Sequence, residues 1–513
     1  MSTTIHPWPS TVNENSGWLG SHSLAIRRSK RINPLSVLPA VLVCVIGWSA
    51  YWFSSPLLLW TALVPALAAG LASPVRLVQL LVITAPVFPV IRLQQDMVDA
   101  RQFSTKGLFL SVDDPLIVAL VLAWGVAWLR RRQPRAEMFP SALVWLGLVY
   151  PLAILANVFR LAPNQTMVSL LYYLKWAQYA ALILIIPRIV PAAQVPPLLS
   201  SLRKLLLIAI GASAVFATYE TIESIRTSSF TGTARFPRAS AFFGTLNPAK
   251  FGASEDPVNF GVFAMVASGI ALSLWSNSRQ KGRTFCLISL LSSFLCMLLS
   301  ASRAPLIAGA VSTARIQRFR VSHILVLIVA ALVTGIIIMF VAPQVWSTVA
   351  QRFDAMTDWQ ANLEHSAMTR LTVVLHSPVF DMDQYWLTGH GFFSYRFVAE
   401  EHLSRITGGI THSLYNFPMT VWYDAGPVGL TLWIVLFLQL NKRFLLIASS
   451  PAWAELRALA WGLRGALWGL AAASMFSEIP YGWRVMGFFY TCCGICFAGE
   501  LAWRRTFWKQ QRG

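Results

Sequence analysis

The sequence predicts an all-α, polytopic integral membrane protein with about 12–14 transmembrane helices and a large extracytoplasmic loop. Hydrophobic residues make up 56% of the 513-residue chain and charged residues only 12%, whereas an ordinary soluble domain has about 25% charged residues. The apolar residues also gather into runs long enough to cross a bilayer. These observations exclude a disordered or disulfide-stapled chain and argue against a soluble enzyme. The spans are expected to be helical, because only helices or closed barrels satisfy their backbone groups in lipid.

Each apolar run of about 20 residues is a candidate transmembrane helix. The second, third and tenth runs have the weakest signals, and a count of twelve would fit if the first two short runs formed a re-entrant pair. The expected spans lie near 36–53, 55–73, 75–91, 114–130, 139–159, 167–187, 203–221, 257–276, 284–301, 304–314, 322–342, 414–440, 455–476 and 484–502.

The basic residues indicate the orientation of these spans. The formal net charge is +20, from 41 Lys and Arg against 21 Asp and Glu. The basic residues form short clusters between the apolar runs, and an alternating count that starts inside puts every cluster on the cytoplasmic side, as the positive-inside rule requires. We therefore interpret the positive charge as a marker of the cytoplasmic side of the membrane and expect no nucleic-acid partner. The clusters lie at 27–31, 130–135, 279–283, 315–320, 442–443 and 504–505.

This topology divides the chain into five parts. Both termini are expected in the cytoplasm, and no cleavable signal peptide is expected. The parts are a basic N-terminal tail (1–35), membrane helices with an outer loop near 222–256 (36–342), a large periplasmic loop (343–412), C-terminal membrane helices (413–503) and a cytoplasmic tail (504–513).

The sequence predicts neither a metal site nor another cofactor. The six cysteines all lie in apolar runs, where cysteine behaves as a small hydrophobic residue. Cys493 and Cys496 form a CxxC pair inside a predicted helix, without the second pair that a zinc site needs. Asp381-Met382-Asp383 has the form of a metal-binding motif, but no neighbouring feature supports it, and Asp113-Asp114 is the other close acidic pair expected outside.

Arginines expected at the outer face are the first candidates for binding an anion. Arg303 directly precedes Ala304 and Pro305, so it begins a helix at the outer membrane surface. It either anchors the span in the headgroups or binds a phosphate, which a helix N-terminus also favours. Arg235 and Arg238 lie in an outer segment, against the positive-inside trend, and a guanidinium binds phosphate in bidentate fashion.

A second set of candidates lies just before and within the run 414–440. His412 and Asn416 are four residues apart, so one helix face would present both, with Tyr415 beside them. A neutral imidazole is a natural base for a sugar hydroxyl, although a histidine at a membrane boundary can also be structural. The sequence Gly426-Pro427-Val428-Gly429 predicts a backbone turn or close helix packing.

The predicted loop 343–412 and one charged residue within a span complete the set. Gly389 and Gly391 predict a tight turn that carries His390, and Arg370 is a further substrate-binding candidate. The loop is rich in aromatic and acidic side chains, which suit sugar binding, although a lid without chemistry is the alternative. Lys175 lies in the middle of the run 167–187 and needs a carboxylate partner or a cavity, which the sequence does not identify.

Taken in order, these segments resemble the O-antigen ligase/polymerase family of bacterial membrane glycosyltransferases. The resemblance covers about residues 200–440 and rests on the order and outward placement of the motifs, since each motif alone is weak. The matched residues are Arg238 with Phe243-Gly244 and Asn247-Pro248, then Ser302-Arg303, then Pro378 with Gly389-His390-Gly391, then His412-Ser413 with Asn416 and Gly426-Pro427-Val428-Gly429.

The resemblance implies transfer of a glycan from undecaprenyl pyrophosphate to an acceptor hydroxyl at the periplasmic face of the bacterial inner membrane, without a metal or nucleotide sugar. Arg238 and Arg303 would bind the donor pyrophosphate and stabilise its departure, and His412 would take the acceptor proton. The remaining candidates, Arg235, His390, Arg370, Asn416 and Tyr415, would bind substrate. The family often has His directly before Asn at the position of Asn416, whereas His412 lies one helical turn earlier, so His390 is the alternate base.

Three functions stay open at this point. A polymerase and a ligase of this family share one site, and the aromatic, acidic loop favours a saccharide acceptor over a lipid acceptor and hence a polymerase. A chain-length regulator could be a further partner of a polymerase. A lipid-linked glycan flippase or other transporter would show two related halves and ionisable residues at the midplane, and the sequence shows no repeat.

Overall fold

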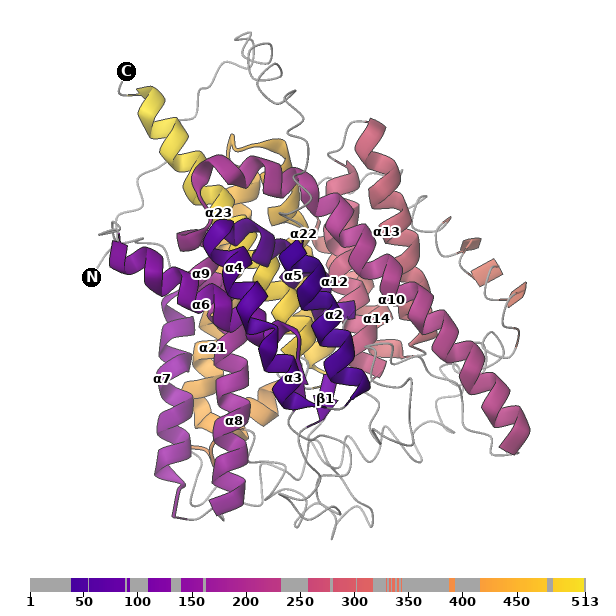
Figure 1. Ribbon diagram of the computed structural model, residues 1–513, viewed down its shortest axis with the longest axis horizontal. Coiled ribbons are helices and arrows are strands. Elements are labelled where there is room, and N and C mark those ends of the chain that lie inside the picture. Colours follow the sequence, from indigo (N-terminus) through magenta and orange to yellow (C-terminus); the bar gives the residue numbers. More distant parts are fainter. Residues whose placement is uncertain are drawn as a thin grey trace.

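Among the residues that the structure describes, the protein is an all-helical membrane protein apart from one short hairpin (Figure 1). The computed structural model describes residues 38–53, 55–87, 90–92, 109–130, 140–159, 163–231, 257–276, 280–300, 302–316, 387–392, 416–477 and 483–511, with isolated positions between 329 and 343. The helices are α2 (Leu38–Trp52), α3 (Pro56–Thr61), α4 (Leu63–Ala72), α5 (Pro74–Val87), α6 (Asp113–Arg130), α7 (Ser141–Ala156), α8 (Pro163–Ala180), α9 (Leu182–Ile189), η2 (Ala192–Gln194), α10 (Val195–Thr231), α12 (Pro257–Ser276), α13 (Gln280–Leu299), α14 (Arg303–Arg315), α21 (Phe417–Ser449), α22 (Ala454–Ser474) and α23 (Trp483–Gln511). Strands β1 (Val90–Arg92) and β2 (Phe109–Ser111) pair in antiparallel fashion.

Length and composition identify this bundle as membrane-embedded. Within the described ranges, six helices are long and apolar enough to cross a membrane. Four shorter apolar helices accompany them: Val41–Ala50, Leu57–Ala72, Pro74–Thr84 and Ser141–Ala156. The six long helices are Gln165–Ile189, Ala192–Tyr219, Val258–Ser276, Gly282–Leu299, Phe417–Ser449 and Val485–Phe507.

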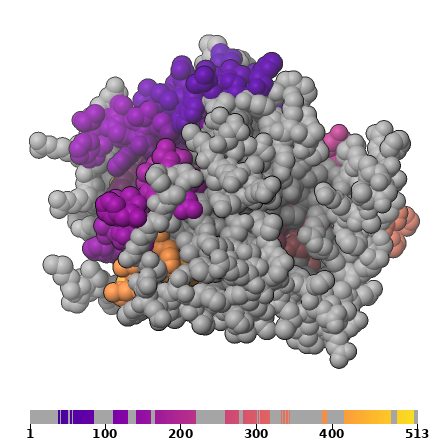
Figure 2. Space-filling model, turned by 90° about the horizontal axis from the view of Figure 1, so that it is seen from below, coloured from indigo at the N-terminus to yellow at the C-terminus, as the bar shows by residue number. Residues whose placement is uncertain are grey.

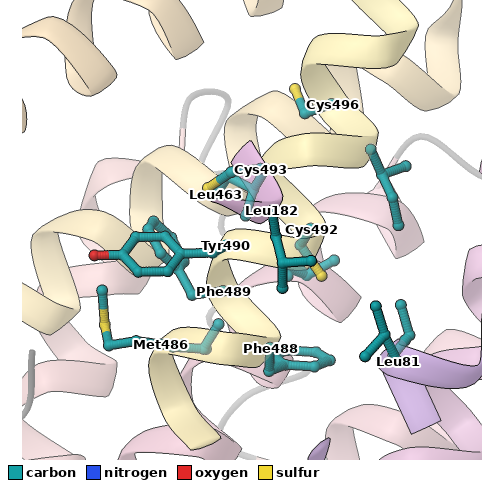
Figure 3. Packing of buried hydrophobic residues seen from close by; sticks show 14 of the residues in the cluster. Leu81, Leu182, Leu463, Met486, Phe488, Phe489, Tyr490, Cys492, Cys493 and Cys496 are labelled. Carbon is teal, nitrogen blue, oxygen red and sulfur yellow. The ribbon is translucent and has the colours of Figure 1, made fainter. Parts of the chain in front are cut away.

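Helix α23 is the central column of the bundle. Every described residue from Val485 to Glu500 is buried, and the helix packs on α5, α8, α9, α10, α12 and α22. A helix that is apolar on all sides is stable only when it is surrounded. Figure 3 shows aromatic side chains and cysteines of α23 against Leu81, Leu182 and Leu463. The cysteines of α23 are buried within this apolar packing, which agrees with their interpretation as small hydrophobic residues.

The two ends of the bundle differ in charge. We call the end with β1 and β2 the hairpin end; it lies at the bottom of Figure 1. The hairpin lies directly before the start of α6. Figure 2 views the hairpin end and shows α7 and α8, in magenta, beside the orange region of α21. The opposite end carries the C-terminal parts of α14, α21 and α23, where arginines gather: Arg315, Arg443 and Arg504.

One long helix is broken inside the bundle. Gly426 in α21 has φ 64° and ψ −169°, which are not helical values, and Pro427 follows it. Proline has no N–H and clashes with the preceding turn, and the left-handed φ of Gly426 is available at little cost only to glycine. The prediction of a backbone turn at Gly426-Pro427 is therefore confirmed.

Candidate functional site

The contacts between α14 and α22 show which residues of the two helices lie side by side. A Cβ on Gly465 would lie 2.7 Å from the carbonyl oxygen of Ser312. A Cβ on Gly469, one turn later, would lie 2.9 Å from the carbonyl oxygen of Ala308, one turn earlier. The two helices are therefore antiparallel and in close contact, as small residues at membrane-helix interfaces permit.

Extending this register places four helix termini at one end of the bundle. The backbone of Arg303, the first residue of α14, comes level with Ser474 at the end of α22. The next residue, Met475, accepts a hydrogen bond from Nδ2 of Asn416 at 3.3 Å. Helix α12 runs parallel to α14 and packs on its first turn, because Gly261 contacts Pro305. The starts of α12, α14 and α21 therefore lie at the same end of the bundle as the end of α22.

Asn416 caps α21 instead of lying within it. Its backbone is extended, with φ −145° and ψ 113°, and its side-chain oxygen accepts a hydrogen bond from the N–H of Met419 at 3.1 Å. Asparagine is among the residues most favoured at this position. The prediction that a helix face presents His412 and Asn416 together is therefore wrong, because the helix begins only at Phe417.

The structure brings two of the predicted site positions together and separates a third. It describes the backbone of Arg303 and the whole of Asn416, each of which lies beside the end of α22, and it describes His390 deeper in the bundle. Five predicted site residues lie outside the described residues: Arg235, Arg238, Arg370, His412 and Tyr415.

The turn formed by residues 387–392 packs on the broken part of α21. The N–H of His390 donates to the carbonyl oxygen of Tyr423 at 2.8 Å, and the N–H of Gly391 donates to that of Asp424 at 2.9 Å. Gly389 and Gly391 have φ values of 66° and 103°, so the predicted tight turn is confirmed. Because the break at Gly426 removes helical donors for these carbonyl oxygens, the turn replaces the hydrogen bonds that the helix loses.

The His390 side chain is packed within this contact. Its ring is 8% exposed and stacks on the ring of Tyr423, with centroids 4.1 Å apart and an interplanar angle of 11°. Its Nδ1 lies 3.2 Å from the Tyr423 carbonyl oxygen. Tyr423 lies seven residues beyond Asn416, or about 10 Å along the helix. This geometry suits a histidine that fixes the turn to α21. The contact lies further into the bundle than the start of α21 at Asn416.

The other side of the turn is attached to α7 and α8. Nδ2 of Asn157, which ends α7, donates to the carbonyl oxygens of Ala153 at 2.8 Å and of Gly389 at 3.0 Å. Phe392 is 1% exposed, and its ring centroid lies 4.5 Å from that of Tyr150 and 6.2 Å from that of Trp176. The turn is thus enclosed by three helices.

A buried ion pair lies on another side of α8. Lys175 Nζ contacts Asp114 Oδ1, and the two side chains are 7% and 3% exposed. Oδ1 of Asp114 also accepts a hydrogen bond from Gln178 Nε2 at 2.8 Å, and Oδ2 accepts one from the N–H of Ser111 at 2.8 Å. Asp114 is therefore the partner that the sequence did not identify for Lys175. Asp113 and Asp114 are both buried at the start of α6, and Asp113 accepts a hydrogen bond from Thr84 Oγ1.

The ion pair lies well away from the arginine-rich end of the bundle. The N–H of Ser111 binds Asp114, Ser111 Oγ lies 3.4 Å from Tyr179 Oη, and the ring of Tyr179 lies against Gly487 of α23. Glu500, which binds arginines at the opposite end, lies about 20 Å further along α23. This distance is shorter than the thickness of a hydrocarbon core, which is about 30 Å. Burial of a charge there requires such a partner.

Sequence reasoning missed two polar residues that hold the turn. Asp424 is fully buried in an apolar span, which is itself a signal, because an acidic residue inside a membrane helix is costly unless it has a role. Asn157 gave a weaker signal, since an asparagine after an apolar run usually marks only a helix end.

No family model matches the chain, and no curated protein matches it significantly. Within the part of the chain that the structure describes, no group of three or more His, Cys, Asp or Glu side chains could hold a metal ion. The assignment of a function therefore rests on the residues of the chain itself.

Proposed function

We propose that the protein is a membrane glycosyltransferase that moves a glycan from undecaprenyl pyrophosphate to an acceptor hydroxyl, and that it polymerises the repeats of a surface polysaccharide. The observation that carries this proposal is that the starts of α12, α14 and α21 lie at the same end of the bundle as the end of α22. Two of the predicted functional segments begin there, at Arg303 and at Asn416. The segment with Arg235 and Arg238 leads into the start of α12 in the sequence.

The start of α14 has the properties of a pyrophosphate site. Its N-cap residue, Ser302, makes no side-chain hydrogen bond to the first N–H groups of the helix. Those N–H groups and the partial positive charge of the helix start favour an anion, and the Arg303 guanidinium would add a full charge. The start of α21 differs, because the Asn416 side chain already occupies one of its N–H groups.

The proposed reaction needs one base and one site for the leaving group. The acceptor oxygen attacks the anomeric carbon, its proton passes to His412, the bond from that carbon to the pyrophosphate oxygen breaks, and undecaprenyl pyrophosphate leaves with both electrons. Arg238 and Arg303 stabilise the charge that develops on it. We prefer His412 to His390 as the base. His412 lies within four residues, or about 14 Å of chain, of Asn416, whereas the His390 ring is stacked and bonded to Tyr423.

We further propose that the hairpin end faces the periplasm. Arginines of α14, α21, α22 and α23 gather toward the opposite end, and short positively charged segments stay in the cytoplasm. With 12–14 helices, both termini would then be cytoplasmic, the protein would span the bacterial inner membrane, and the residues between 343 and 412 would supply most of the periplasmic loop around the site.

One observation favours a second function, transport of a lipid-linked glycan. The pair of Lys175 and Asp114 is buried among the membrane helices, where transporters place residues that bind ions or substrate. A ligase of the same family is the alternative within the first proposal, because it would use the same residues on a different acceptor.

The first experiment identifies the lipid-linked glycan that accumulates when the gene is deleted, sized by mass spectrometry and assigned to a membrane face. Single repeats on the outer face would support the polymerase. Long chains on the outer face would mean a ligase, and repeats held on the inner face would mean a transporter and would refute the transferase.

The second experiment tests the residues in purified, reconstituted protein. Arg303→Ala should abolish transfer, and Arg303→Lys should recover little of it, because lysine keeps the charge but not the bidentate contact. A merely anchoring arginine would tolerate lysine. His412→Ala should cost orders of magnitude in turnover, with His402→Ala as the matched control in the same segment. Transfer that survives His412→Ala but not His390→Phe would reverse the choice of base, and strict dependence on added Mg²⁺ would refute the metal-free mechanism.

A further inference from the structure

Four side chains from three helices form a cluster at the opposite end of the bundle, which we call the Arg315–Arg464 cluster. Arg315 ends α14, Asn441 lies in α21, and Arg464 and Trp468 lie one turn apart in α22. The oxygen Oδ1 of Asn441 accepts hydrogen bonds from Arg464 Nε and from Trp468 Nε1, both at 3.0 Å. The Arg315 guanidinium stacks on the Trp468 ring, 4.1 Å from its centroid.

The cluster holds two positive charges without a negative one. Arg315 stacks on Trp468, and Trp468 and Arg464 share Asn441 Oδ1, so the two guanidinium groups place like charges in one cluster. Among the described residues, neither arginine has an ion pair with a carboxylate, and Asn441 offers only a neutral oxygen. Holding two like charges together costs free energy, and an anion bound by both would lower that cost.

Two neighbouring arginines show the ordinary solution to the same problem. Arg443 Nε donates to Glu500 Oε2 at 2.8 Å, and Arg504 Nη2 donates to Glu500 Oε1 at 2.7 Å. One carboxylate thus binds both guanidinium groups. The cluster around Arg464 instead uses Asn441 and Trp468 to orient its guanidinium groups, as a site for an external anion would.

The surroundings of the cluster fit a lipid better than a soluble anion. Arg315 is exposed, whereas Arg464 and Trp468 are half-buried. On α21, three aliphatic side chains near the level of Asn441 are exposed, which is the pattern of a helix face in contact with acyl chains. They are Ile434 (52%), Leu438 (55%) and Leu445 (38%).

We propose that the Arg315–Arg464 cluster binds the phosphate of an anionic phospholipid, with the acyl chains along the exposed face of α21. Arg464 and Arg315 each donate to phosphate oxygens, and Trp468 holds Arg315 in place by its ring. Basic pockets between membrane helices recognise anionic headgroups in this way. The proposal does not depend on the catalytic activity of the protein.

The test measures lipid binding by native mass spectrometry of the full chain with phosphatidylglycerol or phosphatidylcholine. Wild type should retain phosphatidylglycerol in preference to phosphatidylcholine, and Arg315→Gln with Arg464→Gln should weaken that retention about tenfold. The matched control is Lys442→Gln with Arg504→Gln, which removes the same charge at the same end and should change retention less than about twofold. These magnitudes follow from one or two charge-assisted hydrogen bonds.

Three outcomes would overturn the proposal. The first is equal loss in both double variants, which would mean non-specific attraction to the basic end. The second is displacement of phosphatidylglycerol by glycerol phosphate at the same concentration as the lipid, which would mean a site for a soluble anion. The third is a wild-type protein without preference between the two lipids; that comparison requires no variant, so it decides the matter even if the double variant does not fold.

Discussion

Replacing Lys175 by Met should destabilise the protein by about 3 kcal/mol, because it leaves the Asp114 carboxylate buried without its counter-charge. Removing one partner of a buried ion pair typically costs about 3–5 kcal/mol. Asp114 keeps its hydrogen bonds from Gln178 Nε2 and from the N–H of Ser111, both at 2.8 Å, so the lower end of this range applies. A change of about 3 kcal/mol lowers the folding equilibrium constant roughly a hundredfold.

The double variant Lys175→Met with Asp114→Asn separates the charge from the packing. An asparagine oxygen can still accept from Gln178 or Ser111, and no buried charge remains without a partner. Replacing both members of a buried pair by neutral groups is often close to neutral, so this variant should lie within about 1 kcal/mol of wild type. The free energies come from equilibrium unfolding in mixed micelles, followed by circular dichroism.

The pair of Arg203 and Glu455, which is more exposed than Lys175 and Asp114, is the matched control. Its closest nitrogen–oxygen distance is 3.6 Å, and the Glu455 side chain is 40% exposed. Glu455→Gln should therefore cost less than about 1 kcal/mol. The reasoning fails if Lys175→Met costs no more than Glu455→Gln, or if the double variant is as unstable as Lys175→Met alone.

Two further predictions concern the break and the cap of α21. Gly426→Ala should cost about 2–4 kcal/mol in thermal unfolding, because φ is 64° and a Cβ would overlap the carbonyl oxygen of Leu387. The control is Gly125→Ala, which should be neutral or slightly stabilising because a Cβ there would meet nothing within 4 Å. Equal effects of the two substitutions would contradict the role of the break. Asn416→Ala should remove the cap, cost about 1 kcal/mol of stability and speed hydrogen exchange at the Met419 amide. Asn416→Asp should keep that amide protected from exchange, because its carboxylate can still accept the hydrogen bond. Unchanged exchange in both variants would mean that the cap is unimportant.

The positions of most helices could be predicted from the sequence, because hydropathy reports directly which segments are stable in lipid. The predicted span 257–276 coincides with α12, and the prediction 304–314 differs from α14 by one residue at each end. The prediction 414–440 began three residues early and ended nine residues early. Helix α21 continues to Ser449 because hydropathy detects the apolar part of a helix, whereas the backbone hydrogen bonds continue beyond it.

The candidate site could be predicted only in part, because its contacts are long-range. Glycine spacing predicted the turn at His390, since two residues with left-handed φ are a local property. That the turn packs on Tyr423 depends on a contact between segments about 30 residues apart, and the pair of Lys175 with Asp114 depends on one across 61 residues. No local pattern encodes such partners. The prediction that one helix face presents His412 and Asn416 is wrong because the Asn416 side chain caps the helix instead of extending it, and such capping competes with helix formation.

The turn and the break of α21 depend on each other, and this dependence bears on the site. Without the turn, the carbonyl oxygens of Tyr423 and Asp424 would lose the N–H groups that now bind them, at a cost of several kcal/mol for each unsatisfied group in an apolar interior. Without the break at Gly426, the turn would collide with α21. The segment from Asn416 to Tyr423 lies before the break, so its direction is set by the turn, by Asn157 and by the stacked ring of His390. These residues thus set the position of Asn416 and of the start of α21 beside the end of α22.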